Sequence, residues 1–288
     1  MRTIQINILR VYRFPYVICH LTRLLMNRRY TWNRITQCLL VLVAAFALKL
    51  HYSTASADQL RWILAPTTAL VELVSGVTFE FESHAGYISR ERGFLIANSC
   101  AGVNFLIAAF LMLSLRKLLG DRSKEIAWGF IPTAALIAYS ATLVANSARI
   151  TIALLLRQSS VEIGWLSPDQ LHRFEGVFIY FGFLLLLFAL SEKVSAEKTP
   201  DSLRRCLFPL LVYYAIALGV PLLTGAYRQG TAFWRHALFV LLIPLLLTIS
   251  SLIFQRVVQV AMNGGLKQRR YRTDQRPPSK DIVGKAVN

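Results

Sequence analysis

Apolar residues gather in long stretches separated by short polar and basic segments, a pattern typical of a chain that crosses a membrane several times. Most of the stretches approach the roughly 20 residues that a helix needs to span a bilayer. Helices are the default inside a bilayer because a helix satisfies its own backbone hydrogen bonds. The pattern predicts spans at residues 35–50, 102–119, 126–145, 174–190, 206–224 and 237–255.

A seventh apolar stretch covers residues 60–77, but it contains Pro66 and Glu72. A full crossing here would reverse the orientation of everything downstream and would move the basic residues of 116–124 to the outer side. We therefore predict a re-entrant or interfacial helix. With this helix and a small outer β-hairpin, the chain is predicted to be an all-α polytopic membrane protein of about six transmembrane helices.

The hairpin is predicted for residues 77–96, where polar and apolar residues alternate on both sides of a His84-Ala-Gly86 turn. Two roles remain open for it. Its exposed edge could pair with an extended substrate segment, or the hairpin could only shield a site beneath it. The acidic residues Glu80 and Glu82 are expected to be solvated charges with no further role.

Composition and charge agree with this architecture. Of 288 residues, 55% are hydrophobic and 16% are charged, which is typical of a polytopic membrane protein. The net charge of +17 does not indicate nucleic-acid binding, because the basic residues fall between the apolar stretches. Four alternate segments hold 7, 4, 4 and 8 lysines and arginines, which is 23 of the 32. These four basic segments are 1–34, 116–125, 191–205 and 256–288. Because cytoplasmic segments carry the excess of lysine and arginine, both termini are predicted to be cytoplasmic.

The same reasoning divides the chain into four parts. Residues 1–34 form a basic cytoplasmic arm that is interrupted by Pro15, so it resembles a surface-lying segment more than a cleavable signal peptide. Residues 35–190 form the membrane core, and residues 191–255 form a further helical pair. Residues 256–288 form a basic cytoplasmic tail, expected to be disordered or lipid-facing beyond Met262.

Cys100 is the only cysteine that this topology places on the outer side. Cys38 and Cys206 begin helices that start from the cytoplasm, and Cys19 lies in the N-terminal arm. No disulfide across the bilayer can form, so a thiol is kept unpaired on an oxidising face. It could be a small buried thiol that only packs. A helix N-terminus, however, favours thiolate, and Gly102 permits close backbone approach.

Arg149 and His172 are predicted at the same outer boundary as Cys100, on two further helices. Arg149 follows the third span together with Asn146, and the apolar residues after it favour partial burial of its charge. Alone, the arginine could contact lipid headgroups and the histidine could anchor the interface. Together, a thiolate nucleophile, a histidine acid–base and an arginine that holds an oxyanion can carry out acyl transfer.

These residues lie in three short motifs. Asn98-Ser-Cys-Ala-Gly102, Ala145-Asn-Ser-Ala-Arg-Ile150 and His172 to Gly176 follow one another in the order and spacing of the exosortase/archaeosortase family of membrane transpeptidases. The resemblance covers residues 60–190, and Asn104 is similar to a variation of the family's K type. Residues 191–288 lie outside it.

The resemblance implies a cysteine peptidase and transpeptidase of the bacterial cytoplasmic membrane. Its partners would be exported proteins that end in a short motif, a transmembrane helix and a basic cluster. It would also contact membrane lipids, and it would not bind nucleic acid. Cys100 would form a thioester that a second nucleophile resolves. Family members are often paired with exopolysaccharide production.

No cofactor is expected, and no metal is expected because the outer histidines lack ligand spacing. These histidines are His51, His84, His172 and His236. The alternative is a non-catalytic membrane assembly factor or a transporter component, in which Arg149 pairs with Glu175 for structure.

Overall fold

A computed structural model describes residues 28–120, 126–158, 168–194 and 202–274 of the chain. Six of its helices are long and apolar enough to cross a membrane, so the predicted multi-pass, all-α architecture is confirmed. In chain order the elements are α2 (Arg28–Thr54), α3 (Arg61–Ser75), β1 (Glu80–Glu82), β2 (Gly86–Ser89), β3 (Phe94–Ile96), the 3₁₀ turn η2 (Asn98–Cys100), α4 (Val103–Gly120), α5 (Phe130–Gln158), α6 (Pro168–Val194), α7 (Ser202–Tyr214), the π-helical segment η3 (Ala215–Gly219), α8 (Val220–Leu223), η4 (Ala226–Gln229) and α9 (Thr231–Asp274).

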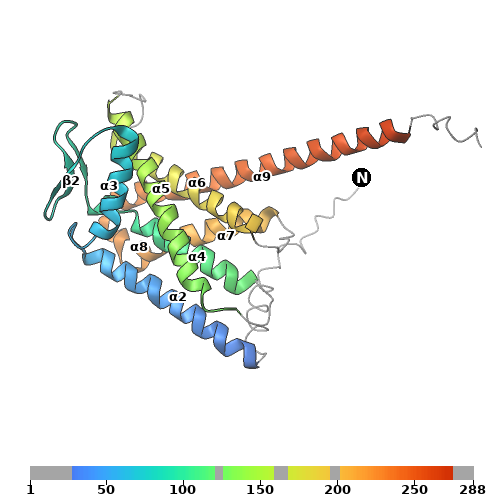
Figure 1. Ribbon diagram of the computed structural model, residues 1–288, viewed down its shortest axis with the longest axis horizontal. Helices are drawn as coiled ribbons and strands as arrows, with labels where there is room; N and C mark the ends of the chain where they lie inside the picture. Colours follow the sequence, from blue (N-terminus) through green and yellow to red (C-terminus); the bar gives the residue numbers. More distant parts are fainter. Residues whose placement is uncertain (1–27, 121–125, 159–167, 195–201, 275–288) are drawn as a thin grey trace, which may run out of the picture.

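Helix α4 lies at the centre of the bundle (Figure 1). It packs against α2, α5, α6 and α7, and its span is 67% buried, more than any other span of the described chain. Its interior residues include Ile107, Ala109 and Met112. The Cys100 turn comes directly before α4. The turn is therefore held at the middle of one end of the bundle, which we call the Cys100 end.

Helix α3 is the helix predicted at residues 60–77, and it is too short to be a span. It runs in the same direction as α5, because Tyr139 donates a hydrogen bond to the Trp62 carbonyl and Ser147 donates one to the Thr67 carbonyl. These bonds measure 2.7 and 3.3 Å. Gly76 ends α3 in the left-handed conformation, where glycine carries no steric cost.

The predicted hairpin is present, with its turn at residues 83–85, and it continues into a third strand. The strand order is β1-β2-β3, all antiparallel. A three-residue strand such as β3 is too short to show an alternating pattern in the sequence. The backbone N–H of Phe79 donates to the Glu72 carboxylate at 2.7 Å, and the Arg61 guanidinium lies 4.4 Å from the Phe81 ring centre. These contacts fix the sheet to α3.

The hairpin turn is also tied to the segment between α2 and α3. Asp58 accepts hydrogen bonds from the His84 backbone N–H at 2.9 Å and from the Ser83 hydroxyl at 3.0 Å. The hydrogen bond from His84 holds the pKa of Asp58 below its ordinary value. Glu80 and Glu82, expected to be solvated, form exposed ion pairs with Arg90. Such exposed pairs add little stability.

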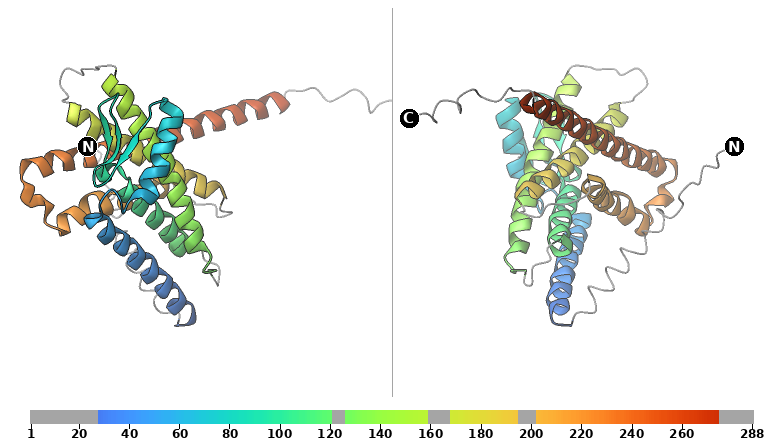
Figure 2. Two further views of the ribbon diagram at one scale, coloured as in Figure 1. Left: turned by 60° about the vertical axis from the view of Figure 1, so that its left-hand side comes forward. Right: turned by 90° about the vertical axis from the view of Figure 1, so that its right-hand side faces the viewer.

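Several predicted boundaries were wrong. Helix α2 already begins at Arg28, inside the predicted arm, whose residues 1–27 lie outside the described chain. By contrast, the span predicted at 206–224 is confirmed, because Arg205–Leu223 is one apolar stretch long enough to cross, in which α7, the π-helical η3 and α8 follow one another. Helix α9 continues to Asp274 and projects away from the bundle (Figures 1 and 2), so residues 262–274 are helical and not disordered, while residues 275–288 lie outside the described chain. Two glycines at 264–265 do not end it, since each costs a helix only about 1 kcal/mol.

Candidate functional site

Cys100 lies on a tight turn whose shape is fixed by local hydrogen bonds. Its backbone N–H donates to the Ala97 carbonyl at 2.9 Å, and the side chain of Asn98 accepts from the Ser99 N–H at 2.8 Å. Gly102 then takes a left-handed conformation, with φ of 71°. This conformation turns the chain from η2 into α4, so the thiol stands at the entrance of the central helix.

Asn146 of α5 connects that helix to the Cys100 turn. Its side-chain N–H donates to the Cys100 carbonyl at 2.7 Å, and the residue is 0% exposed. A Cβ on Gly102 would lie 3.1 Å from the Asn146 side chain. Positive φ strains any other residue at position 102, and the close approach of Asn146 also favours glycine there.

Tyr180 of α6 joins the same network. Its hydroxyl donates to Asn146 Oδ1 at 2.7 Å and accepts from Arg149 Nη1 at 3.3 Å. Its ring stacks on Phe105 of α4, with 5.2 Å between the ring centres. A chain of hydrogen bonds thus runs from Arg149 through Tyr180 and Asn146 to the Cys100 carbonyl, and it links α5, α6 and the start of α4.

Arg149 lies inside α5 and not beyond its end, because the helix continues through Asn146 to Gln158. Its guanidinium carbon is 5.4 Å from the Tyr180 ring centre. A Cβ on Gly176 would come within 2.9 Å of Arg149 Nε, so this glycine lets α6 pass close to the arginine. The charge of Arg149 also interacts with Cys100 and with the buried Glu175.

His172 lies in α6, one helical turn before Gly176 and two turns before Tyr180. Residues spaced by four share a face of a helix, so its backbone position is on the side of α6 that carries Tyr180. The side chain of His172 lies outside the described part of the structure. The network described here is therefore built from Cys100, Asn146, Arg149 and Tyr180.

Sequence reasoning missed Tyr180, Tyr52 and Lys49. Tyr180 follows His172 at helical spacing, which is the only signal in the sequence that could have indicated it. Tyr52 of α2 interacts electrostatically with Cys100 and Arg149. Lys49 of α2 donates a 2.7 Å hydrogen bond to Asn104, one turn beyond Cys100 on α4. The site thus draws on α2 as well as on the three helices of the motifs.

Metal ligation finds no support in the described residues, where no group of three His, Cys, Asp or Glu residues could hold an ion. The site's own groups comprise a thiol, a guanidinium, an amide and a phenol. A thiol can act as a nucleophile, and a fixed guanidinium can stabilise an oxyanion.

Comparison with protein-family models, with curated proteins and with solved structures found no match to this chain. The resemblance to exosortases therefore rests on the three motifs alone.

Proposed function

We propose that the chain is a membrane-embedded cysteine peptidase or transpeptidase that cleaves C-terminal sorting signals of exported proteins, with its site on the outer face of the bacterial cytoplasmic membrane. The observation that carries the proposal is the network at the Cys100 turn. Arg149 reaches the Cys100 carbonyl through Tyr180 and Asn146. A guanidinium linked in this way to the backbone of a cysteine supplies a nucleophile and an oxyanion donor within one hydrogen-bonded unit.

The proposed reaction is acyl transfer in two steps. The Cys100 thiolate attacks the carbonyl carbon of the scissile peptide, and the carbonyl oxygen becomes an oxyanion that Arg149 stabilises. The C–N bond then breaks, the amine of the C-terminal segment leaves with a proton from His172, and the N-terminal part of the protein remains on Cys100 as a thioester. A second nucleophile loses its proton to His172 and attacks the thioester, which releases the protein and regenerates the thiolate and the protonated His172.

The network explains why an arginine suits this position. Tyr180 accepts a hydrogen bond from one terminal nitrogen of Arg149, and the tyrosine ring lies beneath the guanidinium. A planar guanidinium presents its donors in a fixed fork, which an ammonium on a flexible stem cannot reproduce. The expected role of Arg149 is therefore geometric as well as electrostatic.

One observation favours the alternative, a non-catalytic assembly factor or transporter component. Glu175 is only 6% exposed and interacts electrostatically with Arg149. A buried pair of this kind could serve structure alone, since removal of one partner of such a pair commonly destabilises a protein by about 3–5 kcal/mol. The two readings differ in whether Cys100 is needed once the protein is folded.

Replacement of Cys100 by alanine tests this difference. The full chain is co-expressed with a substrate that carries a C-terminal motif, an apolar helix and a basic cluster, and maturation is followed by immunoblot. Cys100→Ala is expected to abolish maturation while the protein remains inserted. Cys206→Ala is the control, because Cys206 is buried between α7 and α9 and contacts Ser251 at 3.8 Å. Maturation at the wild-type rate in Cys100→Ala would refute the proposal.

A further inference from the structure

The end of α2 reaches the Cys100 end of the bundle (Figure 1), and one hydrogen bond on each side of Cys100 holds it there. Lys49 donates a 2.7 Å hydrogen bond to Asn104 Oδ1, which follows Cys100 in the chain. Just after α2, the Ala55 carbonyl accepts a 3.5 Å hydrogen bond from Asn98, which precedes Cys100. Helix α2 therefore runs antiparallel to this segment, and the residue midway between Lys49 and Ala55 lies opposite Cys100.

Tyr52 occupies that midway position. It lies three residues after Lys49, and residues spaced by three share a face of a helix. Its side chain is half-buried against the core, and the Lys49 ammonium lies 5.6 Å from the centre of its ring. The phenol also interacts electrostatically with Cys100, Arg149 and Tyr180. A fourth helix thus brings a polar side chain to the Cys100 network.

The Tyr52 hydroxyl is available to a ligand. It forms no hydrogen bond with the residues that the structure describes, and it is not among their fully enclosed polar atoms. A phenol carries its proton at neutral pH, so this hydroxyl can donate one hydrogen bond. A donor that is in place before the substrate arrives costs no reorganisation when negative charge develops beside it. These are the properties of an oxyanion-hole donor.

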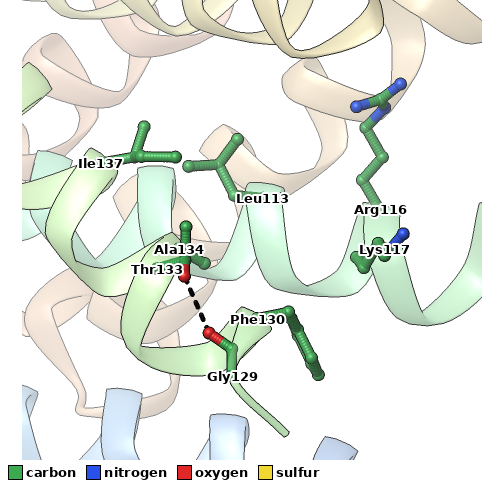
Figure 3. Close-up of a pocket in the computed structure, with 8 residues that line it drawn as sticks. All are labelled: Leu113, Arg116, Lys117, Gly129, Phe130, Thr133, Ala134 and Ile137. Atoms are coloured by element: carbon green, nitrogen blue, oxygen red, sulfur yellow. Dashed lines mark hydrogen bonds between the residues drawn. The ribbon is translucent and has the colours of Figure 1, made fainter. Parts of the chain in front are cut away.

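The pocket drawn in Figure 3 lies in a different part of the bundle. It is formed between α4 and α5, and Leu113, one of its lining residues, is thirteen residues beyond Cys100, which is roughly 20 Å along a helix. Arg116, which also lines it, already donates a 2.9 Å hydrogen bond to Ser191 of α6. A peptide that reaches Cys100 therefore meets Tyr52 and not this pocket.

We propose that the Tyr52 hydroxyl is a second oxyanion donor, alongside Arg149, for the acyl transfer at Cys100. This role rests on the proposed function. When the thiolate attacks the carbonyl carbon, the electron pair of the C=O π bond moves to the oxygen, and Tyr52 donates a hydrogen bond to that oxygen without giving up its proton. The hydrogen bond weakens when the C=O bond re-forms in the thioester, and it strengthens again when the second nucleophile attacks.

Two small reagents separate an effect on the oxyanion from an effect on the thiol. The full chain is purified with its other three cysteines replaced, so that Cys100 is the only thiol. Acylation by p-nitrophenyl acetate passes through a tetrahedral oxyanion, whereas alkylation by iodoacetamide is a direct displacement without one. Tyr52→Phe keeps the ring and removes only the hydroxyl. It is expected to slow acylation of Cys100 by about 100-fold, the effect of losing one oxyanion donor, and to leave alkylation unchanged.

Tyr139→Phe is the matched control, because the Tyr139 hydroxyl bonds to the Trp62 carbonyl and not to the Cys100 network. It should leave both rates unchanged. Acylation at the wild-type rate in Tyr52→Phe, or an equal loss of acylation and alkylation, would overturn the assignment of Tyr52. So would a wild-type chain whose acylation rate, relative to its alkylation rate, is no higher than that of free cysteine.

These outcomes are distinct from failure of the proposed function, because neither reagent needs a sorting signal. Loss of maturation in Cys100→Ala, together with unchanged acylation in Tyr52→Phe, would keep the peptidase and remove only this donor. Wild-type maturation in Cys100→Ala would remove the peptidase, and the role of Tyr52 with it.

Discussion

Tyr180→Phe tests whether the hydrogen-bond network positions the reacting groups. The substitution removes one hydroxyl and two hydrogen bonds, the donation to Asn146 at 2.7 Å and the acceptance from Arg149 at 3.3 Å. The ring that stacks on Phe105 stays. Asn146 is fully buried, and a buried acceptor without its donor costs about 1–3 kcal/mol.

That cost sets the size of the expected effect. If the whole of this free energy is lost from the transition state, through misplacement of Arg149 and the Cys100 turn, substrate maturation slows by about 5- to 160-fold, because about 1.4 kcal/mol corresponds to a factor of ten. The rate at which iodoacetamide alkylates Cys100, in a variant without the other cysteines, should change as well, since the hydrogen bonds that hold Arg149 and Asn146 at the Cys100 turn are lost. This second measurement needs no substrate, so it remains informative if the proposed function is wrong.

Tyr139→Phe is the matched control. Tyr139 is also a tyrosine on a packed helix face and also donates a 2.7 Å hydrogen bond, but its acceptor is the Trp62 carbonyl on α3. It should leave both rates unchanged. Equal rates in Tyr180→Phe and the wild type, or equal losses in Tyr180→Phe and Tyr139→Phe, would show that the network has no specific positioning role.

Arg149→Lys should lower the rate of substrate maturation by about 100- to 1,000-fold, which is the usual effect of losing an oxyanion donor. Arg157→Lys, near the end of α5, should leave the rate unchanged. Similar maturation rates in the two variants would show that Arg149 contributes only its charge. A membrane-impermeant maleimide added to intact cells should label Cys100 and not Cys206, and labelling of Cys206 alone would reverse the proposed orientation. The pKa of Asp58 is lowered in the folded protein, so its stabilisation of the hairpin turn is fully present above the ordinary aspartate pKa and is lost as the pH falls through the lower folded value. Proteolysis at that turn should therefore increase only in strong acid. Cleavage that already rises near pH 6 would contradict this.

The spans were predictable because each is a run of apolar residues, but their ends were not. Helix α5 was expected to end at Ala145, since polar residues follow. It continues because those residues find partners on other elements. Asn146 bonds to the Cys100 carbonyl, and Ser147 bonds to the Leu143 carbonyl of its own helix and to Thr67 of α3. A sequence shows that a residue is polar, but not that a neighbour will satisfy it.

The candidate site was also predictable only in part: the sequence indicated Cys100 and Arg149 but not Tyr180. Cys100 stands out as an unpaired thiol on the predicted outer face, and Arg149 stands out because a charge is costly at a membrane boundary. The fold brings their helices together. Tyr180 does not stand out, because a tyrosine within an apolar helix ordinarily indicates packing. Its role became visible only from contacts with two other helices. The roles of Cys100, Arg149 and His172 in chemistry stay predictions.

The central claim is that Cys100 carries the acyl group of a cleaved protein. Peptide mass spectrometry of the chain, purified from cells that also express a substrate with a C-terminal sorting signal, measures this directly. The account predicts an adduct on the Cys100 peptide that hydroxylamine removes and that increases when the second step is slowed. Substrate that matures at the wild-type rate while Cys100 stays an unmodified, alkylatable thiol throughout would contradict it.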